Sequence, residues 1–299
     1  MACEKSYQIV ADENEMKWFF DHVIEEPKNF ESYLVCLSSR AKKLSAEERY
    51  ELGTNGSEML RTEIIRKRGG NWNFDIYKQG PYKYNCSYSA MLTKKGKPYP
   101  EKSLTCYAYF NPSSELACGR DTMEYFTSIQ NELINSYEKK SEGGIEASIK
   151  KLTKVFDYHR SCHATNVSRR VWRDMDCDIE IPDYYGASSN EDILDGFYKS
   201  AHELLLSTFG KGNFVVIKTT GGFHILVRVS SLKGDPRLVI EQLKTSSFST
   251  PEIASGTAGD IIKEIKFLDK GSAFVPLPGT RQYKNVVRVL NKEDFDTTH

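Results

Sequence analysis

The sequence predicts an α+β fold in which an antiparallel sheet carries helices on one face. The prediction depends on the order of elements in the second half of the chain. We expect, in sequence order, a strand over 170–181, a helix over 190–209, strands over 214–219 and 223–229, a helix over 235–244, and short strands near 274 and over 286–290. Apolar residues alternate along the strands, and Pro236 opens the second helix.

The first part of the chain has a mixed order of elements. We expect a helix over 13–24, strands over 33–37, 59–66 and 104–110, and a helix over 121–137. The Ser141-Glu-Gly-Gly144 segment is a plausible hinge because paired glycines stop a helix, and a helix over 145–156 follows it. We therefore divide the chain into an N-terminal α/β module, 1–144, and a second module, 145–299.

Composition limits the class of protein. The chain has 299 residues, of which 39% are hydrophobic and 27% charged, as in ordinary globular proteins. No run of 18 apolar residues is present, and the N-terminus lacks the residue order of a signal peptide. Seven cysteines at irregular spacing indicate reduced thiols. We expect a cytoplasmic protein with no membrane partner.

The net charge of zero conceals a basic segment. Residues 61–110 contain ten Lys or Arg and three Asp or Glu, which makes this stretch +7 and the remaining chain −7. Ten aromatic residues lie within it, Tyr82, Tyr84, Tyr107 and Tyr109 among them. Basic side chains neutralise phosphates and aromatic rings stack on unpaired bases, so the segment is a candidate template-binding surface. A tyrosine-rich sheet beside a solvated lysine loop is the alternative interpretation.

Acidic residues occupy every second position of the strand over 170–181. They are Asp174, Asp176, Asp178 and Glu180, with Met175, Cys177 and Ile179 between them. In a strand this period places the carboxylates on one face and the apolar residues on the other. Neighbouring carboxylates repel unless a cation offsets them, so the pattern favours a metal site over a solvated acidic edge strand.

The strand pair further along the chain adds a histidine. Two apolar runs meet at Gly221-Gly222, and His224 opens the second run. Leu268-Asp269 and Leu277-Pro-Gly-Thr280 follow at some distance. The order of these motifs resembles the archaeo-eukaryotic primase superfamily, the primase-polymerases, particularly viral or plasmid members. The resemblance covers residues 170–284 and implies a fold close to the RNA-recognition motif, with the active site in a cleft beside the N-terminal module.

The resemblance implies roles for individual residues. Two acids at alternate positions would bind metal, and Asp174 with Asp176, Asp176 with Asp178, and Asp178 with Glu180 all satisfy the spacing; we select Asp176 and Asp178. His224 would contact the phosphates of the incoming nucleotide, with Lys218, Thr220, Gly221 and Gly222 cradling them. Asp269 would be the third metal-binding acid, with Asp260 in reserve. Pro276 stands where the family usually has an arginine, and Arg281 or Lys284 could replace it.

The implied activity is template-directed nucleotidyl transfer from NTPs or dNTPs on single-stranded DNA, by a DNA primase or DNA-directed polymerase. Two Mg²⁺ or Mn²⁺ ions held by carboxylates suit this chemistry. The family resemblance also implies a replicative helicase, fused or separate, as a partner, and a bacterial or virus-infected host cell. Two alternatives remain: a non-catalytic DNA-binding module of replication initiation on a primase-like fold, and a metal-dependent nuclease with His224 as a general base.

Overall fold

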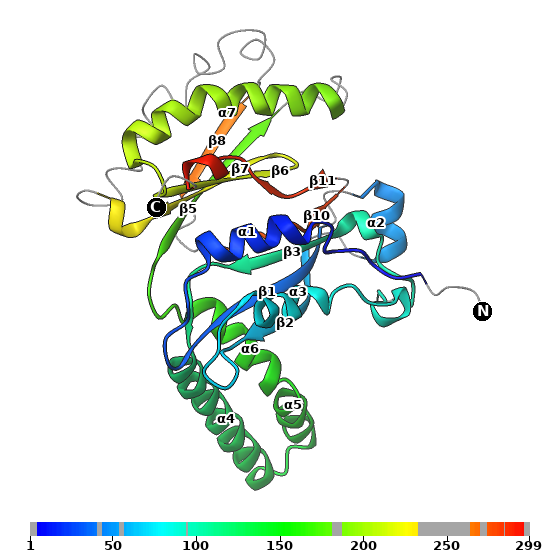
Figure 1. Cartoon of the computed structure of the whole chain (residues 1–299). Coiled ribbons are helices and arrows are strands. Elements are labelled where there is room, and N and C mark those ends of the chain that lie inside the picture. The colour runs from blue at the N-terminus through cyan, green and yellow to red at the C-terminus, as the bar shows by residue number, and fades with distance from the viewer. Residues whose placement is uncertain are drawn as a thin grey trace.

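Two antiparallel sheets form the body of the protein (Figure 1). The computed structural model describes residues 5–40, 44–53, 57–93, 95–180, 187–232, 264–269, 274–283 and 285–295. The helices are α1 (Glu13–Val23), α2 (Ala46–Leu52), α3 (Phe74–Tyr82), α4 (Glu115–Glu138), α5 (Glu142–Leu152), α6 (Val155–Thr165) and α7 (Ala187–Phe209). Short 3-10 turns cover Tyr88–Ala90, Glu101–Ser103, Val229–Ser231 and Lys292–Asp294. The α+β class predicted from the sequence is confirmed.

The first sheet draws strands from both ends of the chain. Its spatial order is β11 (Asn285–Val286), β10 (Arg281–Gln282), β3 (Leu104–Tyr109), β1 (Glu31–Arg40) and β2 (Ser57–Ile65). Two further strands pair outside this order, β4 (Ser113–Ser114) with β1 and β9 (Phe274–Pro276) with β3. Helices α1 and α3 cover one face, because α1 presents Met16, Phe19, Phe20 and Val23 to the core at helical spacing.

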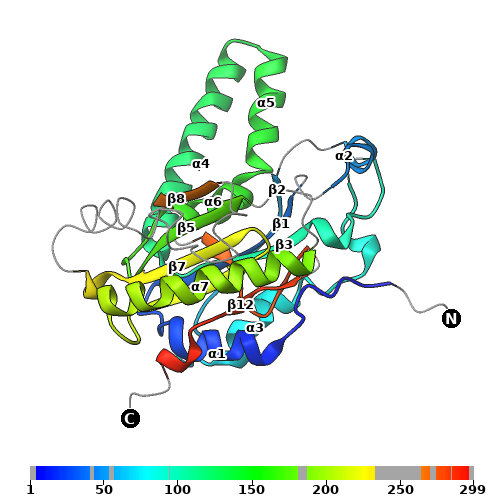
Figure 2. The same ribbon diagram turned by 90° about the horizontal axis from the view of Figure 1, so that it is seen from above.

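The second sheet contains the acidic strand. Its spatial order is β12 (Arg288–Val289), β6 (Phe214–Thr219), β7 (Gly222–Arg228), β5 (Trp172–Glu180) and β8 (Glu264–Asp269), and each neighbouring pair is antiparallel. Helix α7 lies over one face (Figure 2). The helix expected over 235–244 lies outside the described residues.

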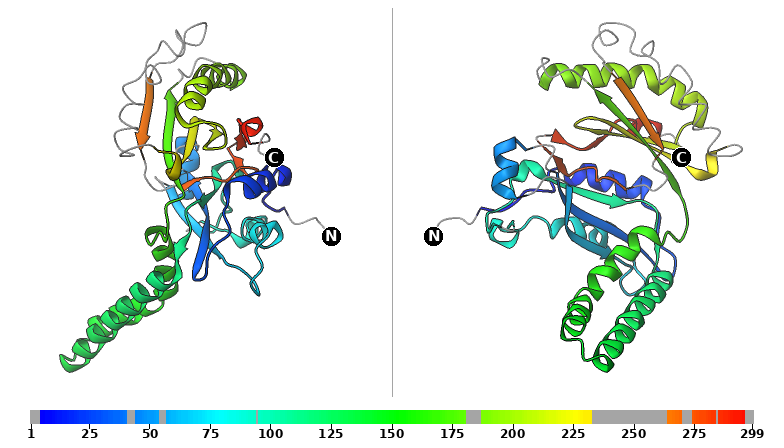
Figure 3. Two further views of the ribbon diagram at one scale, coloured as in Figure 1. Left: turned by 60° about the vertical axis from the view of Figure 1, so that its left-hand side comes forward. Right: turned by 180° about the vertical axis from the view of Figure 1, so that it is seen from behind.

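The chain division predicted at residue 144 does not separate the two sheets. Ser141 caps α5 by accepting a hydrogen bond from the Gly144 N–H at 3.3 Å, so the expected hinge is the first turn of a helix. Helices α4 and α5 form an arm that extends away from both sheets (Figure 3), whereas α6 packs against α4 and against β1, β2 and β4 of the first sheet. Strands β9, β10 and β11 then return to the first sheet, which local sequence patterns do not reveal.

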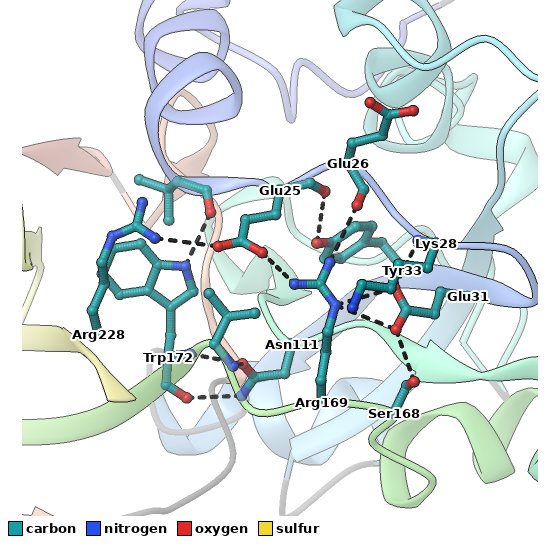
Figure 4. Close-up of polar contacts among 12 residues, drawn as sticks. Glu25, Glu26, Lys28, Glu31, Tyr33, Asn111, Ser168, Arg169, Trp172 and Arg228 are labelled. Atoms are coloured by element: carbon teal, nitrogen blue, oxygen red, sulfur yellow. Dashed lines mark hydrogen bonds and ion pairs between the residues drawn. The ribbon is translucent and has the colours of Figure 1, made fainter. Parts of the chain in front are cut away.

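A polar junction fixes the start of β5 against the N-terminal elements (Figure 4). Trp172 is fully buried, and its indole N–H donates to the Val23 carbonyl at the end of α1 (3.0 Å). The Asn111 side chain accepts from the backbone N–H of Trp172 at 2.9 Å and donates to its carbonyl at 2.8 Å. Because these groups are buried and paired, the junction sets the position of the acidic strand relative to the first sheet.

Charged side chains surround this junction. Arg169 pairs with Glu25 and Glu31, and Arg228 reaches Glu25 at 3.2 Å while its guanidinium lies 4.6 Å from the centre of the Trp172 indole ring. These contacts connect β7 and the segment before β5 to the loop after α1 (Figure 4). The two sheets are therefore tied together at one end of the acidic strand.

Candidate functional site

The two faces of β5 differ as the alternation predicts. Met175, Cys177 and Ile179 belong to the apolar cluster under α7, together with α7 residues such as Phe197 and Leu205. The aspartates at even positions lie on the other face and differ in accessibility. Asp174 is 0% exposed, Asp176 is 5% exposed, and Asp178 is exposed. The carboxylates thus pass from full burial to solvent along one face of the strand.

His224 lies directly across from this face, because β7 pairs with β5 in a register that sets His224 opposite Asp176. The Nδ1 atom of His224 lies 3.1 Å from Oδ1 of Asp174, and the Nε2 atom lies 3.6 Å from Oδ1 of Asp176. A carboxylate only accepts hydrogen bonds, so Nδ1 carries the hydrogen in the contact with Asp174. This arrangement orients the imidazole and directs Nε2 toward Asp176.

The burial gradient distinguishes among the possible acid pairs. Asp174 is enclosed beneath His224, where a bound cation would have to displace the imidazole contact. Asp176 and Asp178 are the next two same-face acids toward solvent. The backbone of Glu180 pairs with Glu264, but its side chain lies outside the described part of the structure. Among the described acids, the geometry favours Asp176 and Asp178 as the pair that could hold a divalent ion.

Asp269 occupies a strand next to the acidic strand. The register of β5 with β8 sets Asp269 opposite Met175, whereas Leu268 stands opposite Asp176. For β8 the structure describes only the backbone. The proposed role of Asp269 as a metal ligand therefore stays a prediction. The reserve acid Asp260 and the possible phosphate contact Lys284 lie outside the described residues, and Arg281 is half-buried in β10. Within the described residues, no three His, Cys, Asp or Glu side chains form a metal-binding group.

The predicted nucleotide-binding residues separate into two places. Lys218 stands opposite Phe223, a residue of the cluster under α7, and its Nζ pairs with Asp195 of α7 at 2.6 Å. Lys218 therefore lies on the α7 face, whereas His224 lies on the other face. Together with Thr220 and Gln282, Lys218 lines a pocket of about 400 Å³ at the edge of the sheet. This pocket is not lined by His224 or Asp176.

The glycines and Thr220 have clear structural roles in the β6–β7 turn. Gly222 has φ +151°, and a Cβ atom there would lie 2.0 Å from the Cys177 carbonyl oxygen. The Thr220 N–H donates to Oε1 of Gln282 (2.8 Å), and its hydroxyl donates to the Gln282 carbonyl (3.0 Å). The Gly221 carbonyl accepts from the Ile179 N–H at 3.1 Å. The turn is thus held against both β5 and β10.

The first sheet adds residues that sequence reasoning did not assign to the site. The Arg40 guanidinium lies 5.1 Å from the centre of the Tyr107 ring. Burial raises the pKa of Tyr107 to about 12; Arg40 and Gln282 oppose the rise, and the Asp176 carboxylate adds to it. Asp176 of the second sheet is thus one of the groups that influence the pKa of Tyr107 in the first sheet. Arg40 and Gln282 are isolated polar residues at strand ends. The local sequence around them gives no sign that the first sheet lies close to the acidic strand here.

The basic, aromatic segment contributes mainly to the core. Tyr77, Tyr84 and Phe110 are buried between the first sheet and its helices, and the Tyr84 hydroxyl donates to the Val35 carbonyl at 2.9 Å. Tyr84 is therefore not available to stack on a base. Arg66 pairs with Glu115, and Lys67 lies 2.6 Å from Glu26. Core packing accounts for these rings, but Tyr77 lies in α3, Tyr84 follows α3 and Phe110 follows β3, so they are not part of a tyrosine-rich sheet.

Comparison with protein-family models, with curated proteins and with solved structures finds no match to this chain. None of the described helices is both long and apolar enough to cross a membrane.

Proposed function

We propose that the protein is a DNA primase or DNA-directed polymerase of the primase-polymerase type. The single observation that carries the proposal is the arrangement of Asp174, His224 and Asp176 on two paired strands, with Asp178 beyond them toward solvent. Carboxylates on one strand could bind metal ions, and a histidine on the paired strand could bind a phosphate beside them.

The strand order adds support for a fold close to the RNA-recognition motif. Four strands of the second sheet lie side by side in the order β8, β5, β7, β6. The first of them in the chain, β5, is therefore the neighbour of the last, β8. The hairpin strands β6 and β7 lie on the other side of β5. A primase-like active site between modules would also use residues from the first sheet. Asp176 is one of the groups that raise the pKa of Tyr107 on β3, which supports a position of the acidic strand beside the first sheet.

The donor set suits a hard divalent cation. Asp176 and Asp178 offer carboxylate oxygens at alternate positions of one strand, and Mg²⁺ and Mn²⁺ prefer such ligands. When bound, such ions would activate the attacking 3′-hydroxyl and stabilise the pyrophosphate leaving group. Asp176 and Asp178 would hold the ions, and Asp174 would hold His224 in place to meet the nucleotide phosphates.

The test is incorporation of labelled nucleotide on a single-stranded DNA template, with and without Mg²⁺ or Mn²⁺. Metal-dependent extension that is absent from Asp176→Asn supports the proposal. Shortening of a labelled strand would instead identify a metal-dependent nuclease that uses the same acids. A protein that shifts the strand unchanged in both conditions would not be a polymerase.

A non-catalytic DNA-binding module on the same fold is the second candidate. The observation that favours it is the register of β8, in which Asp269 stands opposite Met175 and not opposite Asp176. Pro276, at the position where the resemblance expects an arginine, is buried in β9. This candidate predicts the same strand affinity with and without divalent ions, and no nucleotide incorporation.

A further inference from the structure

The arm formed by α4 and α5 has almost no core of its own. Figure 2 shows the two helices side by side as they leave the body of the protein. The buried residues of α4 are Cys118 and Ile129, and α5 buries only Ser148. A helix is stable in a protein when another element covers its apolar stripe, and two helices alone bury little apolar surface. The arm is therefore expected to pack against a further layer.

Exposed apolar side chains gather on this part of the chain. Ten large apolar side chains are exposed in the described residues, and six of them lie between 116 and 156. They are Leu116, Met123, Ile134, Tyr137, Ile149 and Phe156, with exposed fractions from 51% to 78%. Single exposed apolar residues are ordinary, whereas such a concentration marks an interaction surface.

The apolar residues of both helices lie on one side of the arm. Glu132 of α4 and Lys151 of α5 form an ion pair at 2.6 Å between the two helices. Antiparallel helices turn in opposite senses when viewed from one end. The next residue of each, Leu133 and Leu152, therefore lies on the same side of the arm, opposite the ion pair. Further apolar residues follow these two at helical spacing. We call the set the arm face: Met123, Phe126, Leu133 and Tyr137 of α4, with Ile149 and Leu152 of α5.

The net charge of the arm does not suit nucleic acid. Residues 115–154 contain seven Asp or Glu and six Lys or Arg, which gives a net charge of −1. A surface that binds phosphates needs an excess of positive charge. The arm face is therefore suited to another protein surface.

Charges along α5 and the turn after it are separated by sign. Glu142 and Glu146 come first, and Lys150 and Lys154 follow at the same spacing of four residues. All four side chains are exposed, and within the described residues none of them has an ion-pair partner. Two copies of α5 that pair antiparallel about position 148 would bring Glu146 next to Lys150 of the second copy, and Glu142 next to its Lys154. The surface is thus self-complementary, as a two-fold interface between identical chains must be.

We propose that the arm is a dimerisation element, and that the arm faces of two copies of this chain pack antiparallel as a four-helix bundle. Such a bundle supplies the layer that each arm lacks, since α4 and α5 of one copy cover the apolar residues of the other. The tip of each arm lies beside the base of the other, which brings the acidic half of α5 next to the basic half of its copy. The proposal does not depend on nucleotidyl transfer.

Sedimentation velocity of the full chain between about 1 and 100 µM measures the dissociation constant of the dimer. Ile149→Gln and Met123→Gln should each raise this constant about 100-fold or more, because the two-fold axis removes two buried side chains and each contributes about tenfold. Both positions are exposed in the single chain, so the fold should survive, as circular dichroism would verify. Leu92→Gln is the matched control, because Leu92 is 50% exposed outside the arm. A wild-type chain that stays monomeric up to about 100 µM, a dimer that persists in both arm variants, or an equal loss in Leu92→Gln would overturn the proposal.

Charge exchange tests whether the covering layer is a second copy in this orientation. Glu146→Lys and Lys150→Glu should each weaken the homodimer about 5- to 30-fold, because both interface pairs at these positions become like-charged. An equimolar mixture of the two variants should form a heterodimer with an affinity within about threefold of wild type, since opposite charges meet again. Homodimers of both variants as tight as wild type would assign these charges to the dipole of α5 alone, and a mixture no tighter than the separate variants would exclude the antiparallel pairing. Either result overturns the proposal.

Discussion

The Nδ1 atom of His224 lies 3.1 Å from the Asp174 carboxylate, and both side chains are buried. A buried carboxylate that accepts from Nδ1 holds the ring in one orientation and favours one tautomer. The acid of the series that is least accessible to a metal ion therefore has a different role from its neighbours. We infer that Asp174 positions His224, whereas Asp176 and Asp178 face the reaction.

This positioning role predicts a non-additive pair of substitutions. Asp174→Asn keeps the shape of the side chain but removes its charge, so kcat for nucleotide incorporation should fall about 10- to 100-fold, as when the residue that orients a metal-site histidine is replaced. His224→Ala should raise the nucleotide KM and lower kcat. In the double variant, Asp174→Asn should cause no further loss. A full additional loss in the His224→Ala background would show that Asp174 acts independently of the imidazole.

Asp176→Asn and Asp178→Asn should each abolish metal-dependent incorporation while single-stranded DNA affinity survives. Each change removes one charged oxygen from the candidate ion site and leaves the basic segment 61–110 in place. Incorporation and binding in EDTA are measured on the same preparations. Wild-type turnover in both single variants would remove these acids from the site.

Neutralising the three basic residues that follow β2 tests whether residues 66–68 contact the DNA phosphates. Replacing Arg66, Lys67 and Arg68 together with Gln should weaken single-stranded DNA binding and flatten its salt dependence, by about 0.7 in slope for each phosphate that the protein no longer neutralises. Since Arg66 and Lys67 already pair with Glu115 and Glu26, the change in slope should be smaller than three such phosphates would give. Lys139→Gln with Lys140→Gln is the matched control, and an equal effect there would place the strand elsewhere.

Gly222→Ala should prevent correct pairing of β5 with β7. The new Cβ would lie 2.0 Å from a backbone oxygen of Cys177, and φ +151° is unfavourable for alanine. We expect loss of more than about 3 kcal/mol of unfolding free energy, or insoluble protein. Gly221→Ala is the comparison, because no atom lies within 4 Å of a Cβ there. Denaturant titration should rank the two variants, and equal stability would contradict the described register.

His163 predicts that stability falls in mild acid. Its side chain is 1% exposed, and Nδ1 contacts the hydroxyls of Ser32 (3.1 Å) and Ser113 (2.7 Å). Burial lowers the pKa of His163 from 6.5 to about 4. The pKa of His163 is lower in the folded protein than in the unfolded chain. Its contribution to the free energy of unfolding is therefore complete above about pH 6.5 and is lost as the pH falls toward 4. The loss should reach at most about 3 kcal/mol.

Denaturant titrations at pH 7 and pH 5 measure this contribution, with His163→Asn as the variant that cannot titrate. The pH-dependent difference should be smaller in the variant than in wild type by the amount assigned to His163. A wild-type difference that persists unchanged in His163→Asn would assign the acid sensitivity to other groups.

Several helices and strands could be predicted from the sequence because the signals that define them come from residues close together in the chain. The strand over 214–219 has the predicted bounds, and α1 differs from prediction by one residue, since an Asp12 cap and a helical apolar stripe are local signals. The long helix α4 begins six residues earlier than expected, because Ser114 caps it while Gly119 lies in its interior. Helix α3 was not predicted, since Gly80 and Pro81 interrupt its pattern.

The sequence by itself determined that the aspartates of β5 share one face, because a period of two needs only the backbone of a strand. Only the tertiary structure decided how they differ, since the register places His224 opposite Asp176, its imidazole contacts the buried Asp174, and Asp178 is exposed. The same distinction separates the tyrosines: Tyr84 is enclosed by the core, whereas Tyr109 lies on the face away from it. Burial depends on which distant segment of the chain packs against a residue. The ring that packs against Tyr109 is Phe274, which lies about 165 residues away in the chain.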